Sequence, residues 1–156
     1  GNFREPVADG ADNGSWYEMI GLQSTGHGPR GSIDVTYSDH AITKGLTSWT
    51  TPEEELYNNV RVYDGATILA NGQQMQMPKK KKNQPVNPDA KPTEANAIVA
   101  WTNEYGPEKT RIFSTSLGHH NDTFSDDRYL DLICRGLLWS THKLTDSGEA
   151  VVGYSK

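Results

Sequence analysis

The end of the chain combines a strand, a glycine, two histidines and an amphipathic helix, and this combination restricts the fold more than any other feature. Residues 111–116 alternate as a strand does, and Leu117-Gly118-His119-His120 follows directly. After Ser125 or Asp126 as the N-cap, an apolar stripe recurs at helical spacing, at Leu130, Ile133, Cys134, Leu137 and Leu138. A strand that ends in glycine and polar residues is how α/β sheets present chemistry at strand ends. The segment therefore predicts an α/β fold with polar groups gathered near His119.

Upstream segments predict one short helix and several short strands. Ser15 caps a helix over 15–21 that ends at Gly21, and strands are predicted at 33–37, 60–63, 67–70 and 97–101. The glycine-rich stretch 26–31 predicts a loop, 40–46 a turn, and 53–57 a compact acidic element. The chain is polar beyond Leu144 and is expected to fray there. We assign 1–144 to one domain and 145–156 to a polar tail.

Residues 77–96 lose all periodicity, contain four prolines and carry the basic run Lys79 to Lys82. A polar tract interrupted by prolines cannot bury enough surface to order itself, so we interpret it as a mobile hairpin loop between two strands. The alternative is that the four lysines bind an anionic partner.

Charge, hydropathy and cysteine content exclude several function classes. With 15 Lys and Arg against 20 Asp and Glu, the chain gives no reason to expect nucleic-acid binding. No apolar run approaches the length that spans a bilayer, so we expect a soluble chain without membrane insertion. The single cysteine, Cys134, excludes an internal disulfide and a cysteine-based zinc site. Bacterial cytoplasm, periplasm and secretion all stay open as locations.

Five motifs occur in order between residues 40 and 139. They are His40-Ala-Ile-Thr-Lys-Gly-Leu46, Glu54-Glu-Leu-Tyr57, Ala100-Trp-Thr-x-x-Tyr-Gly106 followed by Arg111-Ile-Phe, Thr115-Ser-Leu-Gly-His119, and Arg135-Gly-Leu-Leu-Trp139. Together they resemble the ThuA-like (trehalose-utilisation) domain family of the class I glutamine-amidotransferase-like superfamily. Two positions depart from the family pattern, and both lie in turns. Ala41 replaces a proline, and 107–110 lacks the glycine that precedes the strand arginine.

The resemblance implies a partial flavodoxin-like, class I glutamine-amidotransferase-like three-layer sheet with flanking helices. It also implies opening βα units upstream, including a strand-end histidine that faces the same cleft. Because these units are missing, we interpret the chain as the C-terminal two-thirds of such a domain. We expect it to pair with a missing N-terminal segment or with another chain, since an open parallel sheet would expose unpaired edges.

Glu55 and His119 are the candidate catalytic residues. His119 follows a strand end and a glycine that lets the backbone approach a ligand; alternatively it caps the following turn. Glu55 suits a general base or a metal ligand; alternatively it holds a loop through backbone N–H groups. The substrate-binding candidates are His27, Tyr57, His120 and Asn121, and Tyr57 also fits the edge of the core.

The other histidines and the cysteine have structural interpretations. His40 is expected to cap a turn, and His142 lies near the end of the last helix, where a cation favours the helix dipole. No cofactor is evident, and a divalent metal would bind His119 and Glu55, although their long-range spacing has no local metal signature. Because Cys134 lies within the predicted apolar helix face, we interpret it as a core residue, and glutaminase activity is disfavoured.

Two functions follow as alternatives. The resemblance implies an enzyme acting on a small-molecule sugar of the trehalose or keto-sugar type, in which Glu55 and His119 share acid/base work beside a sugar carbonyl. The alternative is a non-catalytic binding or assembly module of a larger multidomain protein. A closed pocket that holds both residues would favour the enzyme, and their separation on opposite faces would favour the module.

Overall fold

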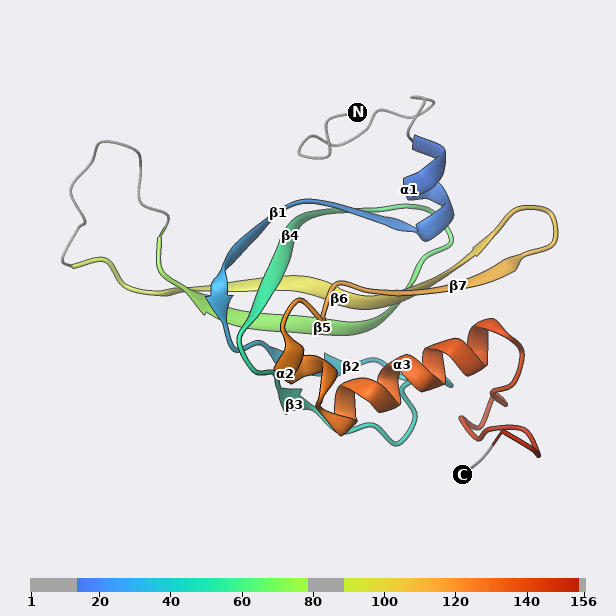
Figure 1. Ribbon diagram of the computed structural model, residues 1–156. Helices are drawn as coiled ribbons and strands as arrows, with labels where there is room; N and C mark the ends of the chain where they lie inside the picture. Colours follow the sequence, from blue (N-terminus) through green and yellow to red (C-terminus); the bar gives the residue numbers. More distant parts are fainter. Residues whose placement is uncertain (1–13, 79–88, 155–156) are drawn as a thin grey trace.

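A computed structural model of the protein describes residues 14–78 and 89–154, and the chain forms an α/β fold (Figure 1). The elements in chain order are α1 (Gly14–Ile20), β1 (Leu22–Gly31), β2 (Asp34–Tyr37), β3 (Trp49–Thr50), β4 (Glu54–Val62), β5 (Thr67–Gln76), β6 (Thr93–Tyr105), β7 (Thr110–Thr115), α2 (Asn121–Phe124) and α3 (Asp127–Ser140). The predicted α/β class and the short helix before Gly21 are confirmed, but Ser15 lies inside α1 and is not its N-cap.

The strands form one five-stranded sheet, in the order β3-β2-β5-β6-β7, and a separate pair, β1-β4. Every pair among the described residues is antiparallel, so the parallel direction that we expected is wrong. The connection between β6 and β7 shows why: it is a tight turn in which Gly106 and Lys109 take φ values of 76° and 48°. A turn of this length joins antiparallel neighbours, whereas a parallel pair needs a crossover of a dozen or more residues.

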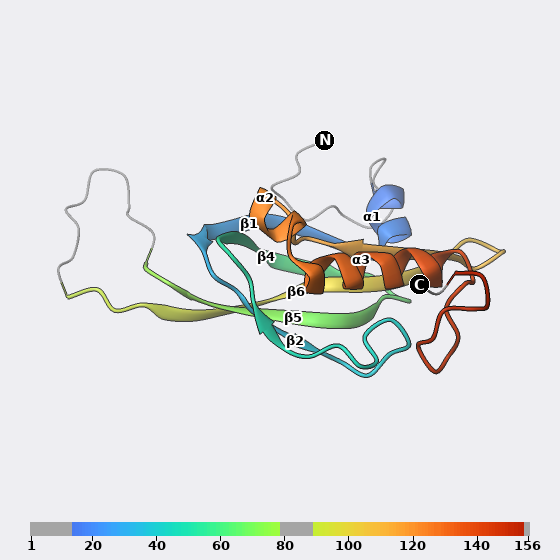
Figure 2. The ribbon, with the colours of Figure 1, turned by 60° about the horizontal axis from the view of Figure 1, so that its bottom comes forward.

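Helices cover both faces of the five-stranded sheet, so β6 lies in a layer between α1 and α3. The indole Nε1 of Trp101 donates to Ile20 O, and Asn103 Nδ2 donates to Glu18 O and Met19 O, so this face of β6 holds α1. Ala100 on the opposite face belongs to the hydrophobic core that α3 closes. Figures 1 and 2 show α1 and α3 on different sides of the strands, with α3 lying across the near face in Figure 2.

Helix α3 is rotated relative to our prediction. Asp126 is its N-cap, as one of the two candidates, but its buried face is Tyr129, Leu132, Gly136 and Trp139. The predicted stripe lies beside this face: Leu130, Cys134 and Leu137 are exposed, whereas Ile133 and Leu138 are partly buried. Gly136 explains the rotation, because a Cβ there would lie 2.4 Å from the Phe113 ring. The missing side chain lets the helix pack closely on β7.

Three segments are more regular than the sequence suggested. Residues 26–31, predicted as a loop, complete β1, and the acidic element at 53–57 opens β4. The ladder between these strands is irregular between His27 and Arg30, where Pro29 has no N–H to donate. The β6 strand begins at Thr93, inside the predicted loop. The basic run at Lys79 to Lys82 lies outside the described residues.

The start of the tail folds back instead of fraying. Leu144 forms a β-bridge with Ala150, and Val151 N donates to Lys143 O at 2.9 Å. Leu144 is buried in the core, so the turn is tied to the domain.

Candidate functional site

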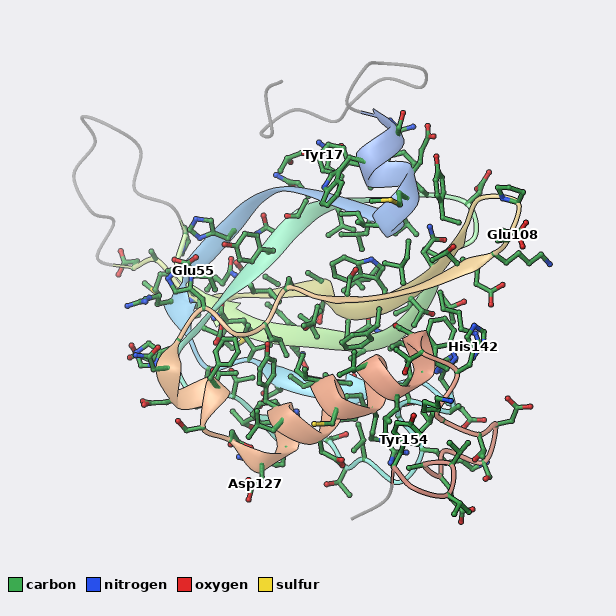
Figure 3. All side chains as sticks on the ribbon, turned by 45° about the vertical axis from the view of Figure 1, so that its right-hand side comes forward. Tyr17, Glu55, Glu108, Asp127, His142 and Tyr154 are labelled. Atoms are coloured by element: carbon green, nitrogen blue, oxygen red, sulfur yellow. The ribbon has the colours of Figure 1, made fainter. Side chains whose placement is uncertain are left out.

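The Glu55 carboxylate lies between two imidazoles that come from distant parts of the chain. Its Oε2 atom is 3.6 Å from Nδ1 of His27 and 3.4 Å from Nδ1 of His119. Figure 3 shows Glu55 at the end of the molecule where β1 and β4 approach α2. The structure therefore brings together both candidate catalytic residues and one of the four substrate-binding candidates.

Strand pairing places these side chains. His27 lies opposite Tyr57 in the β1-β4 ladder, and their ring centroids are 5.4 Å apart. Glu55 lies two residues before Tyr57 and so projects from the same face of β4. His119 arrives from the other sheet, in the loop that follows β7. Tyr57 is thus the second substrate-binding candidate that joins the cluster.

The neighbouring carboxylate, Glu54, is buried and holds the loop that carries His119. Its Oε1 atom accepts hydrogen bonds from Gly118 N (3.2 Å), His120 N (3.1 Å) and Thr123 Oγ1 (2.6 Å), and its Oε2 atom accepts one from His119 N at 3.2 Å. The loop-holding role that we considered for Glu55 therefore belongs to Glu54. Our sequence interpretation missed this residue, although the alternation with buried Leu56 indicates an inward Glu54.

Gly118 lets the loop make this close approach. Its φ of 103° is a conformation that side chains disfavour, and a Cβ would lie 2.4 Å from the Tyr129 hydroxyl. The backbone of His119 is thus held by Glu54, while its side chain meets Glu55. The adjacent residues Glu54 and Glu55 thus hold His119, Glu54 through its backbone and Glu55 through its side chain.

The contacts assign protons to the imidazoles. His27 Nδ1 is 2.8 Å from Gly28 O, and because a carbonyl only accepts, this nitrogen carries the proton. Nδ1 of His119 lies at an ion-pair distance of 3.4 Å from Glu55 Oε2, and the negative charge of a carboxylate favours a proton on the nearer ring nitrogen, Nδ1. Burial raises the pKa of Tyr57 above its ordinary value, and the charge of Glu55 and a hydrogen bond to it act in the same direction. The phenol therefore stays protonated and is a donor at neutral pH.

The cluster lies on an open face. The exposed fractions of the His27 and His119 side chains are 46% and 45%, against 16% for Glu55. A ligand therefore has direct access to both imidazoles, while the carboxylate between them is largely shielded from water. The two candidate catalytic residues share one face of the molecule, but that face is not a closed pocket.

Comparison with protein families adds to this geometry. The family model described as ThuA, trehalose utilisation, matches residues 6–140. The chain belongs to the ThuA family. All five motifs that carry the resemblance lie inside the matched range. Comparisons with curated proteins and with solved structures gave no match.

The remaining substrate-binding candidates of this ThuA domain occupy the first turn after His119. His120 is the N-cap of α2: its Nδ1 accepts from Asp122 N at 3.3 Å and lies 3.5 Å from the Asp122 carboxylate. Asn121 opens the same helix and is exposed, and its carbonyl accepts from Ser125. The side chain of His120 and the carbonyl of Asn121 thus serve the helix, while His120 N donates to Glu54. Their substrate-binding role stays a prediction.

His40 caps its turn, as predicted. Ile42 N donates to His40 Nδ1 at 3.1 Å, and the ring packs edge-on against Trp139. Burial lowers the pKa of His40, and the nearby Arg111 lowers it further. His142 follows the end of α3 with a φ of 58°.

The interpretation of Cys134 as a core residue is wrong, because the rotation of α3 turns its thiol to the surface. The described residues contain no group of three or more His, Cys, Asp or Glu side chains arranged to hold a metal ion. Within the described ranges, no helix is long and apolar enough to cross a membrane.

Proposed function

We propose that this protein acts on a carbohydrate, with Glu55 and His119 as an acid/base pair. Family membership connects the chain with trehalose utilisation. The observation that carries the finer proposal is the 3.4 Å contact between Glu55 Oε2 and His119 Nδ1. A carboxylate on one imidazole nitrogen leaves the other nitrogen free for proton transfer.

The proposed chemistry is proton transfer at a carbon beside a sugar carbonyl. His119 Nε2 takes the proton, the C–H electron pair moves toward the carbonyl, and an enediolate forms. Glu55 stabilises the resulting imidazolium through Nδ1–H. His27 and Tyr57 orient sugar hydroxyls. General acid–base catalysis of this kind contributes about 10²- to 10⁴-fold to a rate.

Deuterium incorporation tests this proposal. A keto sugar with a C–H beside its carbonyl is incubated in D₂O with the wild-type protein, Glu55→Gln or His119→Ala, and loss of the carbon-bound proton is followed by NMR. We expect each variant to slow exchange by about 10²-fold or more. His142→Asn is the control, because His142 has a positive φ that asparagine tolerates and lies at the opposite end of the molecule (Figure 3). If both variants exchange the proton at the wild-type rate, Glu55 and His119 do not act as an acid/base pair.

A binding module without turnover is the second candidate, and the exposure of both imidazoles supports it. In that case Glu55→Gln weakens sugar binding measured by calorimetry, while the wild-type protein shows no deuterium exchange above buffer.

A further inference from the structure

An apolar hollow adjoins the proposed sugar site. Its volume is about 190 Å³, and it lies between α1, the β1-β4 pair and β6. Its apolar walls are Tyr17, Ile20, Leu22, Val60, Ile98 and Trp101. Tyr17 reaches from α1 over the β1-β4 pair (Figure 3). A cavity of about 150 Å³ lined by apolar side chains is large enough for benzene.

Most polar groups in the wall already have partners within the fold. Tyr17 and Gln23 share a hydrogen bond, and Trp101 Nε1 donates to Ile20 O at 2.7 Å. The Ser24 hydroxyl donates to Asn58 O, and the Thr115 hydroxyl to Val99 O. Ser116 Oγ is buried and has no hydrogen-bond partner among the described residues. The wall therefore presents at most one unused polar atom to an occupant.

Tyr57 connects the hollow with the candidate site. Its side chain lines the hollow, and the same ring contacts His27 and lies beside Glu55. Tyr57 is therefore a wall that the hollow and the His27–Glu55–His119 cluster share.

We propose that the site takes a sugar whose substituent is an apolar ring of about benzene size, with the sugar at the cluster and the ring in the hollow. This inference rests on the proposed function and specifies its substrate class. A second sugar ring fits the wall poorly, because each buried hydroxyl without a partner costs about 1–3 kcal/mol. An aryl ring has no such groups and gains from leaving water.

Matched glycosides test the inference without any turnover. Calorimetry measures binding of phenyl β-D-glucopyranoside, methyl β-D-glucopyranoside and trehalose to the wild-type protein. We expect the phenyl glycoside to bind at least about tenfold more tightly than the methyl glycoside, from burial of the ring alone. Trehalose, with a second polar ring, gains no comparable advantage over the methyl glycoside.

Two matched variants locate the effect. Val60→Phe fills the hollow with a ring, so the phenyl and methyl glycosides should bind this variant with about equal affinity. Val62→Phe adds the same ring two residues along β4, at a position that is 44% exposed and outside the hollow, and keeps the advantage. An unchanged amide NMR spectrum confirms that each variant is folded. The comparison of the glycosides on the wild-type protein does not depend on either variant.

The outcomes separate the two proposals. Equal binding of the phenyl and methyl glycosides overturns the aryl inference and leaves the sugar site standing. A phenyl advantage that survives in Val60→Phe also overturns it. Binding of neither glycoside also overturns the aryl inference, whereas the sugar function falls only if the keto sugar shows neither binding nor deuterium exchange.

Discussion

Replacing Glu54 with glutamine tests whether a buried carboxylate positions His119. Three donors converge on Oε1 and one, the His119 N–H, on Oε2. Glutamine keeps its single oxygen where three donors meet, so its NH₂ group turns toward His119 N–H. The NH₂ group and the His119 N–H then face each other as two donors, so this hydrogen bond is lost. The three hydrogen bonds at Oε1 keep an oxygen acceptor, but that oxygen no longer carries negative charge.

The expected loss follows from these contacts. Losing one charge-assisted hydrogen bond costs about 2 kcal/mol, and weakening three others brings the total to about 3–4 kcal/mol of unfolding free energy. Thr123→Val is the control, because it removes one bond to Oε1, costs about 1–2 kcal/mol and leaves the His119 contact intact. Urea unfolding gives the stabilities, and amide hydrogen exchange shows whether the His119 N–H loses protection only in the glutamine variant. Equal stability losses in the two variants, or unchanged protection of His119, would refute the reasoning.

Three further predictions concern other parts of the fold. Burial lowers the pKa of His40, so the stability that its neutral ring contributes is complete above about pH 6.5 and is lost as the pH falls through the lowered value. The urea midpoint should therefore depend less on pH in His40→Asn than in the wild-type protein. Cys134 should react with a thiol reagent at the rate of an exposed thiol without denaturant, and a reaction that requires urea contradicts its surface position. Gly136→Ala should cost about 1–3 kcal/mol because its Cβ meets the Phe113 ring, whereas Leu137→Ala, at 63% exposure, should cost less than about 0.5 kcal/mol in the same thermal unfolding assay.

The meeting of Glu55 and His119 was predicted through the family motifs that contain them. The residues alone predicted a strand end before His119, but they placed Glu55 in an acidic element ahead of a strand at 60–63, whereas β4 begins at Glu54. The sequence also indicated that the Glu54 side chain points inward, because the apolar Leu56 two residues later lies on the same face of the strand.

The helix face and the strand directions depend on contacts that no local pattern contains. The apolar positions of α3 span a broad stripe, and the close contact between Gly136 and Phe113 selects which edge of it is buried. Likewise, short strands with apolar residues read the same in parallel and antiparallel sheets. The pairing with a further segment or chain stays a prediction, as do the sugar and any metal.

The most direct test of the central claim is the tautomer of His119, measured from the imidazole ¹⁵N shifts of the wild-type protein and of Glu55→Gln. If the Glu55 carboxylate holds a proton on Nδ1, the wild-type ring is the Nδ1–H form with a free Nε2, and the variant shifts toward the Nε2–H form that free imidazole prefers. The same tautomer ratio in both proteins would show that the carboxylate does not orient His119, and the acid/base pair would have to be abandoned.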